Sequence, residues 1–297
     1  MRGSAVSGFF NDSVLDGFSG DAFGRREPFP WQAFETLLLP EKFTALLESF
    51  PSVALFDTHR GIARADQQRS HDRYYLAFER NIYRGENAAP GVYCRDGGDN
   101  EMVGPLSIAR TEDLASSGKA IAPTTSAPLS KSGVVDLPDL PAPWQAFMEE
   151  IRSSRRYQAF AERAFGVQPM TVRFAWHLGF QGAEVSPHRD TDKKLGTHIF
   201  YFNTAADWSE EWGGSILVLG DKKVRRKNPD ITDFGSVRAV DIRDNRSFLF
   251  KNTVTAWHGV DALRCPPQRY RRLFNVIFER VEPRPRKTLF QRLTGMR

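Results

Sequence analysis

The second half of the chain contains short apolar runs of the kind that form β-strands. Each run is rich in β-branched and aromatic residues and is bounded by Gly, Asn, Asp or Pro. The runs cover residues 170–180, 197–203, 213–220, 237–242, 247–253 and 272–281. Because no helical pattern interrupts them, they predict an antiparallel barrel or jelly roll, a mainly β fold.

Two earlier stretches carry apolar residues at helical spacing. Residues 29–50 predict a helical entry segment, in which Pro40 and Glu41 suit the first turn of a second helix. Residues 144–165 predict a helix that packs on the following strands, and Gly166 offers its C-terminal stop. The fold class is therefore a β core with flanking helices.

Composition changes along the chain and suggests its division. Residues 85–142 are rich in Gly, Ser, Thr and Pro and predict long loops, whereas the C-terminal tail is basic. We expect an N-terminal helical and loop-rich region over 1–143, packing on or covering the core. The barrel with its supporting helix would span 144–285, and the basic tail 286–297.

Charge and targeting signals narrow the function classes. The formal net charge is +5 in 297 residues, with the basic residues spread along the chain and no nucleic-acid-binding motif. No apolar run is long enough for a membrane helix, and the first residues do not resemble a secretory signal, so we expect a cytoplasmic protein. Cys94 and Cys265 lie far apart and predict neither a disulfide framework nor a metal site.

The segment SPHRDTDKKLG contains a histidine and a carboxylate two residues apart. In an extended chain such residues point to the same side, so His188 and Asp190 can bind one metal ion. Asp192, four residues from His188, would need a helix to do so. His258 follows 70 residues after His188, at the close of a predicted strand, as a third ligand. Two histidines and one carboxylate suit a non-haem iron(II) that leaves positions for a chelating cosubstrate and O₂.

A cosubstrate with a second carboxylate needs an anchor, and RYRRLFNVIF supplies arginines for it. Their planar fork can donate two parallel hydrogen bonds to a carboxylate. Arg271 and Arg272 point to opposite faces of the predicted strand. Only one of them can face the barrel interior.

The order of motifs from about Met170 to Val281 resembles the iron(II) and 2-oxoglutarate dioxygenases, in their prolyl-hydroxylase-like branch. These motifs are HRD, THIFYFN, W-x-x-E-WGGSILVL, FLFKNTVTAWHGV and RRLFNVIF. The resemblance implies a double-stranded β-helix in which Arg271, four residues before Asn275, binds 2-oxoglutarate together with Tyr201, with Arg272 as the fallback. It also implies that Gly213 and Gly214 form the turn into a strand that faces the metal.

The resemblance further implies the chemistry. Fe(II), 2-oxoglutarate and O₂ would hydroxylate an unactivated C–H bond while 2-oxoglutarate is decarboxylated to succinate and CO₂, with ascorbate as an additional reductant. Family members that halogenate lack the carboxylate ligand, so Asp190 favours hydroxylation. The substrate stays open between a prolyl or peptidyl group and a saccharide, free amino acid or small natural product. A non-catalytic jelly-roll binding protein and a cupin-like hydrolase or isomerase are the competing classes.

Several other residues have structural interpretations. His177 and His198 lie within strand patterns and are expected to be core or barrel-lining residues. Trp257 is expected to pack the barrel. The basic run 221–230 between two strands is expected to be a solvated hairpin tip, with steering of an acidic substrate as the alternative. The oligomeric state is not indicated.

Overall fold

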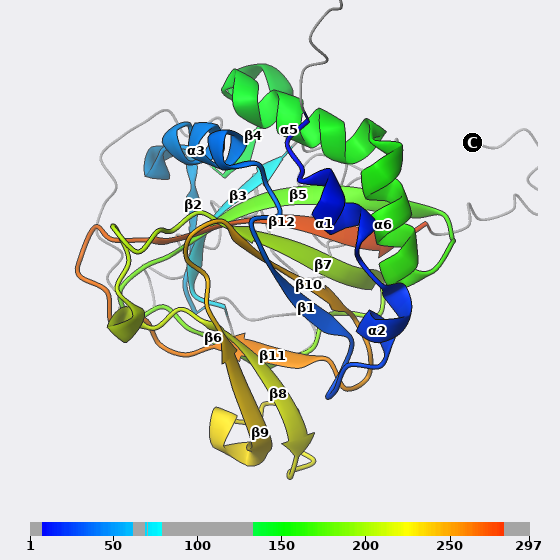
Figure 1. Cartoon of the computed structure of the whole chain (residues 1–297). Helices are drawn as coiled ribbons and strands as arrows, with labels where there is room; N and C mark the ends of the chain where they lie inside the picture. Colours follow the sequence, from blue (N-terminus) through cyan, green and yellow to red (C-terminus); the bar gives the residue numbers. More distant parts are fainter. Residues whose placement is uncertain (1–7, 62–68, 70, 79–132, 282–297) are drawn as a thin grey trace, which may run out of the picture.

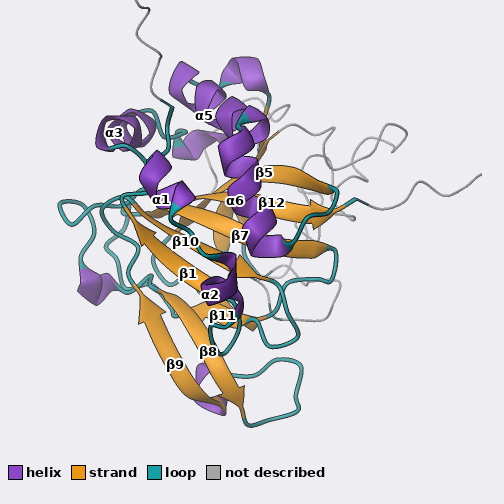
Figure 2. Ribbon diagram, turned by 45° about the vertical axis from the view of Figure 1, so that its right-hand side comes forward, coloured by secondary structure: helices purple, strands orange, loops and turns teal. Residues whose placement is uncertain are grey.

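The computed structural model describes residues 8–61, 69, 71–78 and 133–281 (Figure 1). Most of the predicted loop-rich segment, Cys94 and the basic tail lie outside these residues. The described strands form two sheets that face each other, with helices on the outer side of the larger sheet (Figures 1 and 2).

The larger sheet has eight strands in the order β1-β10-β7-β12-β5-β3-β2, with β4 paired to β3. All pairs are antiparallel except β3 with β4. The bounds are β1 (Trp31–Glu35), β2 (Asp57–His59), β3 (Arg73–Phe78), β4 (Val134–Val135), β5 (Met170–Gly179), β7 (Lys194–Tyr201), β10 (Arg246–Lys251) and β12 (Arg271–Arg280).

The smaller sheet is antiparallel and has the order β6-β11-β8-β9. Its strands are β6 (Val185–His188), β8 (Ile216–Lys222), β9 (Phe234–Val240) and β11 (Trp257–Val260). From β5 to β12 the chain passes repeatedly between the two sheets, and strands distant in sequence become neighbours. This is the topology of a jelly roll, or double-stranded β-helix, and it confirms the predicted fold class.

Helices cover the outer face of the larger sheet (Figure 2). They are α1 (Asp12–Asp16), α2 (Gly20–Gly24), α3 (Pro40–Glu48), α5 (Ala142–Ser153) and α6 (Arg155–Phe165), with short 3₁₀ turns at Val53–Leu55, Leu137–Asp139, Glu210–Trp212 and Ile231–Asp233. One apolar core lies between these helices and the larger sheet, and a second lies between the two sheets. None of the described helices is long and apolar enough to cross a membrane.

The prediction of helix over residues 29–50 is wrong in its first part. Residues Trp31–Glu35 form β1, which pairs with β10 at the edge of the larger sheet and buries Trp31 and Phe34. Pairing with a strand more than 200 residues away in sequence overrides the local helical pattern. The second part is confirmed as α3, which has Pro40 in its first turn.

The helix predicted over residues 144–165 is two helices. Ser154 ends α5 and begins α6, and its Oγ accepts a hydrogen bond from the Tyr157 amide. Because the Ser154 side chain accepts this backbone hydrogen bond, a new helix can start at this residue, as is common for serine at N-caps. Gly166 ends α6 with a positive φ of 93°, which confirms the predicted stop.

His198 is confirmed as a core histidine. Its side chain points from β7 toward the helices, where Nδ1 lies 2.9 Å from the Tyr157 hydroxyl and Nε2 lies 3.1 Å from Ser247 Oγ. Complete burial lowers the pKa of His198 from 6.5 to about 3. The imidazole is therefore neutral in the folded protein at physiological pH.

This burial predicts a specific acid sensitivity. Between pH 6.5 and 3 the unfolded chain binds a proton at residue 198 that the folded chain does not, so stability is lost as the pH falls through 6.5. Between pH 8 and pH 5 we expect His198 to lower the free energy of unfolding by about 2 kcal/mol. Denaturant unfolding of His198→Asn should show a pH dependence smaller by that amount. Parallel curves for the two proteins would contradict the assignment.

Candidate metal and cosubstrate site

Three of the predicted ligands meet between the two sheets. His188 ends β6 and His258 is the second residue of β11, and the two are direct cross-strand partners. Asp190 follows β6 by two residues, with its Oδ1 3.9 Å from His188 Nε2. One ligand atom from each residue lies within 4.8 Å of the other two, and all three residues are buried. His258 thus begins a strand, whereas the sequence analysis expected it to close one.

Backbone carbonyls fix which nitrogen of each histidine can bind a metal. Nδ1 of His188 lies 3.0 Å from the Ser186 carbonyl oxygen, and Nδ1 of His258 lies 3.0 Å from the Ala256 carbonyl oxygen. A carbonyl only accepts, so each Nδ1 carries the proton and donates it. Each Nε2 is then the unprotonated nitrogen, which is the arrangement that metal-binding histidines need.

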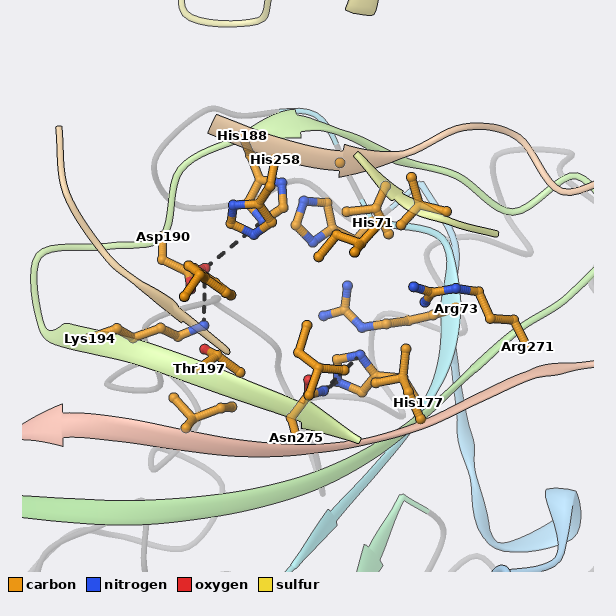
Figure 3. Close-up of a pocket in the computed structure, with 18 residues that line it drawn as sticks. His71, Arg73, His177, His188, Asp190, Lys194, Thr197, His258, Arg271 and Asn275 are labelled. Atoms are coloured by element: carbon orange, nitrogen blue, oxygen red, sulfur yellow. Dashed lines mark hydrogen bonds and ion pairs between the residues drawn. The ribbon is translucent and has the colours of Figure 1, made fainter. Parts of the chain in front are cut away.

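The three residues line a pocket between the sheets, which together with its opening to solvent holds about 610 Å³ of space (Figure 3). Its wall near the triad is formed by β6 and β11, and the opposite wall by strands of the larger sheet. The apolar part of the lining is Val185, Ile199, Ile216, Phe250, Val260, Leu273 and Ile277. The polar part, apart from the triad, is His71, Arg73, His177, Lys194, Thr197, Arg271 and Asn275.

The two candidate arginines point to opposite faces of β12, as the strand period requires. Arg271 lines the pocket, is 5% exposed, and donates from Nε to the Gly214 carbonyl oxygen at 2.6 Å. Arg272 pairs outside the pocket with the carboxylate of Asp207. The geometry therefore favours Arg271 over Arg272 as the residue that meets a ligand in the pocket.

The glycine turn before β8 allows Arg271 to take this position. Gly214 has a φ of 91°, and a Cβ there would lie 3.1 Å from Arg271 Cδ and 3.3 Å from the Trp208 ring. Gly213 has a φ of 76°, and its carbonyl oxygen accepts a hydrogen bond from Trp208 Nε1 at 2.9 Å. A side chain at residue 214 would displace the guanidinium and strain the turn.

Tyr201 lies beside Arg271 rather than in the pocket lining. The Arg271 guanidinium carbon is 5.1 Å from the centre of the Tyr201 ring. The Tyr201 hydroxyl is buried beside Arg271 and has no hydrogen-bond acceptor within the described part of the chain. Burial raises the pKa of Tyr201 to about 12, and the charge of Arg271 opposes this shift. The hydroxyl is thus a protonated donor that a bound carboxylate can satisfy.

The residues present fit both groups that the site would hold. Two imidazoles and one carboxylate form the donor set for a divalent metal with open positions. Arg271 and the buried Tyr201 hydroxyl provide donors for a carboxylate, and Asn275 lines the same pocket with its amide 3.3 Å from His177.

Four polar residues of the pocket were missed by the sequence analysis. His71 and Arg73 come from the segment at β3, Lys194 and Thr197 from β7. The His71 ring centre lies 4.1 Å from that of His188, and Lys194 Nζ lies 3.3 Å from Asp190 Oδ1. Strand alternation after the HRD motif could have indicated Thr197. For residues 71 and 73 no local signal existed, because their positions depend on contacts distant in sequence: the bridge of His71 to Val185 of β6 and the pairing of β3 with β5.

The remaining expectations have clear outcomes. His177 lines the pocket, as a barrel-lining histidine should. Asp192 is exposed and away from the triad. Trp257 packs against Phe234 and lies 4.0 Å below the Lys222 ammonium. In the basic run, Arg226 pairs with two carboxylates, which reduces the positive field that it offers to a substrate.

Comparisons with known proteins give one match to a family model and several likenesses to solved structures. Residues 172–278 match the family model of the 2OG-Fe(II) oxygenase superfamily. No curated protein matches the chain.

The chain is similar to a prolyl hydroxylase from Trichoplax adhaerens in complex with a hypoxia inducible factor peptide, at 12% identity over 90% of each chain with a TM-score of 0.44. It is also similar to a Pseudomonas putida prolyl-4-hydroxylase, at 12% identity over 92% of this chain and 100% of that chain with a TM-score of 0.44. A third likeness is the alpha-ketoglutarate dependent epimerase SnoN from nogalamycin biosynthesis, at 12% identity over 94% and 89% with a TM-score of 0.45.

The two neighbouring aspartates offer a matched test of the metal site. Asp190→Ala removes one buried donor, so we expect divalent metal affinity to fall by more than about 100-fold. Asp192→Ala removes an exposed carboxylate two residues away and should change the affinity by less than about twofold. Calorimetric titration of the metal-free protein with Mn(II), or anaerobically with Fe(II), measures both. Equal losses in the two variants would refute the assignment.

Proposed function

We propose that the protein, whose residues 172–278 match the family model of the 2OG-Fe(II) oxygenase superfamily, hydroxylates an unactivated C–H bond. The proposal assigns His188, Asp190 and His258 to Fe(II), and Arg271, Tyr201 and Asn275 to 2-oxoglutarate. One observation carries it: the buried triad and the buried Arg271 line the same pocket. A binding protein without this chemistry would have no physical need to bury that combination, since each buried charge costs desolvation.

The side chains of this site bind and orient. His188 and His258 present Nε2 lone pairs, because their Nδ1 protons are held by backbone carbonyls. Lys194 contacts the Asp190 carboxylate at 3.3 Å and limits the directions in which it can turn. Arg271, fixed by the Gly214 carbonyl, directs its remaining N–H donors toward the pocket.

When bound, Fe(II) with 2-oxoglutarate and O₂ supplies the oxidising chemistry, by which one oxygen atom enters succinate and the other enters the substrate, with release of CO₂. The chain contributes the environment. The apolar side chains of the lining would reduce the contact of water with groups bound between the triad and the larger sheet. Asp190 fills the carboxylate position of the ligand set, which favours hydroxylation over halogenation.

The proposal extends to substrate and location in general terms. The order of sequence motifs favours a prolyl or peptidyl substrate, with the same chemistry on a saccharide, free amino acid or small natural product as the alternative. We also propose that the protein acts in the cytoplasm. A non-catalytic jelly-roll protein is the second candidate, and the following experiments distinguish it.

Adjacent arginines test the cosubstrate site. Anaerobic mixing of the protein with Fe(II) and 2-oxoglutarate should give the weak visible charge-transfer band of the chelate. Arg271→Gln removes a buried charge-assisted donor pair, so the 2-oxoglutarate Kd from this band should rise about 10- to 100-fold. Arg272→Gln, the same change on the outer face of β12, should leave it within about twofold. No band in the wild type would refute the oxygenase, and a larger effect of Arg272→Gln would reverse the assignment.

The hydroxyl of Tyr201 should strengthen 2-oxoglutarate binding as a neutral donor. Removing it in Tyr201→Phe is expected to weaken binding about tenfold, the effect of one hydrogen bond to a charged group. Because the pKa of Tyr201 is about 12, the hydroxyl keeps its proton through the accessible range. The ratio of variant to wild-type Kd should therefore be the same at pH 7.5 and pH 9.5. An ordinary tyrosine is about a quarter ionised at pH 9.5, so a ratio lower by about that fraction at pH 9.5 would contradict the raised pKa.

A further inference from the structure

The turn of residues 190–194, which leads from Asp190 into β7, is held by a side chain from a distant part of the chain. Asn252 directly follows β10, and its Nδ2 lies 2.7 Å from the Thr191 carbonyl oxygen and 3.1 Å from that of Lys194. The carbonyl oxygen of Asp190 itself lies 3.5 Å away, at the outer limit of a hydrogen bond. Nδ2 of Asn252 thus faces three backbone carbonyls of one short turn.

Strand pairing brings Asn252 to this turn. In the pairing of β10 with β7, Lys251 is opposite Gly196. Asn252 is the next residue, and its backbone N–H donates to the Leu195 carbonyl oxygen at 2.8 Å. The backbone of Asn252 is therefore fixed beside the start of β7, and its side chain extends past the end of that strand toward the turn.

The three neighbours determine which end of the Asn252 amide faces them. Carbonyl oxygens only accept hydrogen bonds, so the end that meets them must be the NH₂ group. Its two N–H groups are directed at the nearer carbonyls, those of Thr191 and Lys194. The other end, Oδ1, is buried and has no hydrogen-bond partner within the described part of the chain. Because burying an unpaired oxygen costs free energy, the side chain stabilises this site only as a donor.

The remaining carbonyls of the turn are held from another side. Arg280, the last residue of β12, donates from its backbone N–H to Lys193 at 3.0 Å and from Nε to Asp192 at 3.3 Å. Its side chain is exposed, in contrast to the half-buried Asn252. The carbonyls that Asn252 contacts include that of Asp190 and the one that follows it. Asn252 therefore holds the half of the turn that carries the proposed ligand.

The Asp190 carboxylate depends on the conformation of this turn. Its Oδ1 lies 3.9 Å from His188 Nε2 and 3.3 Å from Lys194 Nζ (Figure 3). The position of Asp190 in the sequence brings it beside the histidines, but the torsion angles of the turn set the direction of its side chain. A ligand set has to be held within about 0.5 Å of its productive geometry. A small change in the turn would therefore alter the donor set.

We propose that Asn252 is a positioning residue for the metal site, which holds the 190–194 turn so that the Asp190 carboxylate faces the two histidines. The inference rests on the proposed function, since it takes the buried triad as the metal ligands. Asn252 also begins the loop of residues 252–256 that leads to β11 and His258. It thus connects the turn that carries the carboxylate with the segment that carries one histidine, independently of the pairing of β6 with β11.

Removing the Asn252 amide should weaken metal binding. Mn(II), which stands in for Fe(II), is titrated into the metal-free full-length protein, and the electron paramagnetic resonance signal of free Mn(II) gives the Kd. In Asn252→Ala we expect this Kd to rise about 10- to 100-fold, the range for residues that orient metal ligands. A cooperative denaturant unfolding transition of the metal-free variant shows that it is folded.

Asn245 provides the matched control at the opposite end of β10. It directly precedes this strand, and its Nδ2 also donates to a distant backbone carbonyl, that of Leu38 at 2.7 Å. Its φ of 60° disfavours alanine, so Asn245→Ala should lower the free energy of unfolding as well. Because residue 245 holds no part of the 190–194 turn, the Mn(II) Kd of Asn245→Ala should stay within about twofold of wild type.

Asn252→Asp separates the hydrogen bonds from the shape of the side chain. The variant keeps this shape but replaces the donor by an oxygen, which the three carbonyls repel. Its added negative charge would by itself favour a cation. A Kd that is nevertheless higher than that of the wild type, by about tenfold or more, therefore identifies the lost hydrogen bonds as the cause.

A double-variant cycle distinguishes positioning of Asp190 from a general structural role. If Asn252 acts through the Asp190 carboxylate, its effect on metal binding disappears once that carboxylate is removed. We therefore expect Asn252→Ala to change the Mn(II) Kd by less than about threefold in the Asp190→Ala background. A residue that only stabilises the fold would give the same factor in both backgrounds.

Each other result has a definite meaning. A Kd that Asn252→Ala leaves unchanged, or raises by the same factor with and without the Asp190 carboxylate, overturns the inference and leaves the metal site in place. An equal loss in Asn245→Ala also overturns it, because metal binding would then follow general stability. A wild type that binds no Mn(II), or that binds it equally well after Asp190→Ala, overturns the metal assignment and with it the proposed function.

Discussion

The pairing of β6 with β11 is the constraint on which the site depends. These two short strands place His188 opposite His258, so the two imidazoles face each other before any metal is considered. Each ring is then oriented by the backbone carbonyl two residues before it in sequence. The remaining ligand, Asp190, follows His188 by two residues, so the extended chain after β6 is enough to bring its carboxylate beside the two imidazoles. Backbone hydrogen bonding, rather than the metal, thus determines the shape of the donor set.

The barrel strands and the triad could be predicted because their signals are local. Alternate residues of β7 and β12 share a face, so the sequence pattern indicates which positions face the same way. His188 and Asp190 are two residues apart, which is enough to predict that their side chains lie on the same side of the chain. Arg271 and Arg272 could be separated only in part, since alternation places them on opposite faces without saying which face is inside. The pairing of Arg272 with Asp207 decides this, and it requires the tertiary structure.

The errors have the opposite origin, because long-range pairing overrides local pattern. Residues 31–35 have helical spacing but complete the edge of the larger sheet beside β10. Ser154 divides an apparently continuous helix because its side chain caps the second half. Arg73 enters the pocket through the pairing of β3 with β5, and His71 through its bridge to Val185 of β6, in both cases across about 100 residues of sequence. Patterns within a window of a dozen residues carry no information about such contacts.

The placement of β1 and β3 also determines whether the barrel could be produced without the N-terminal part of the chain. These two strands cover the edges that β10 and β5 would otherwise present. A fragment that begins at residue 144 would retain the triad but expose the backbone donors and acceptors of both edges, which are templates for pairing with other chains. It would also lack the wall that bears His71 and Arg73. The N-terminal strands therefore protect the barrel from self-association and also form part of the wall of its cavity. The segment from residue 144 onward is thus not an independent folding unit.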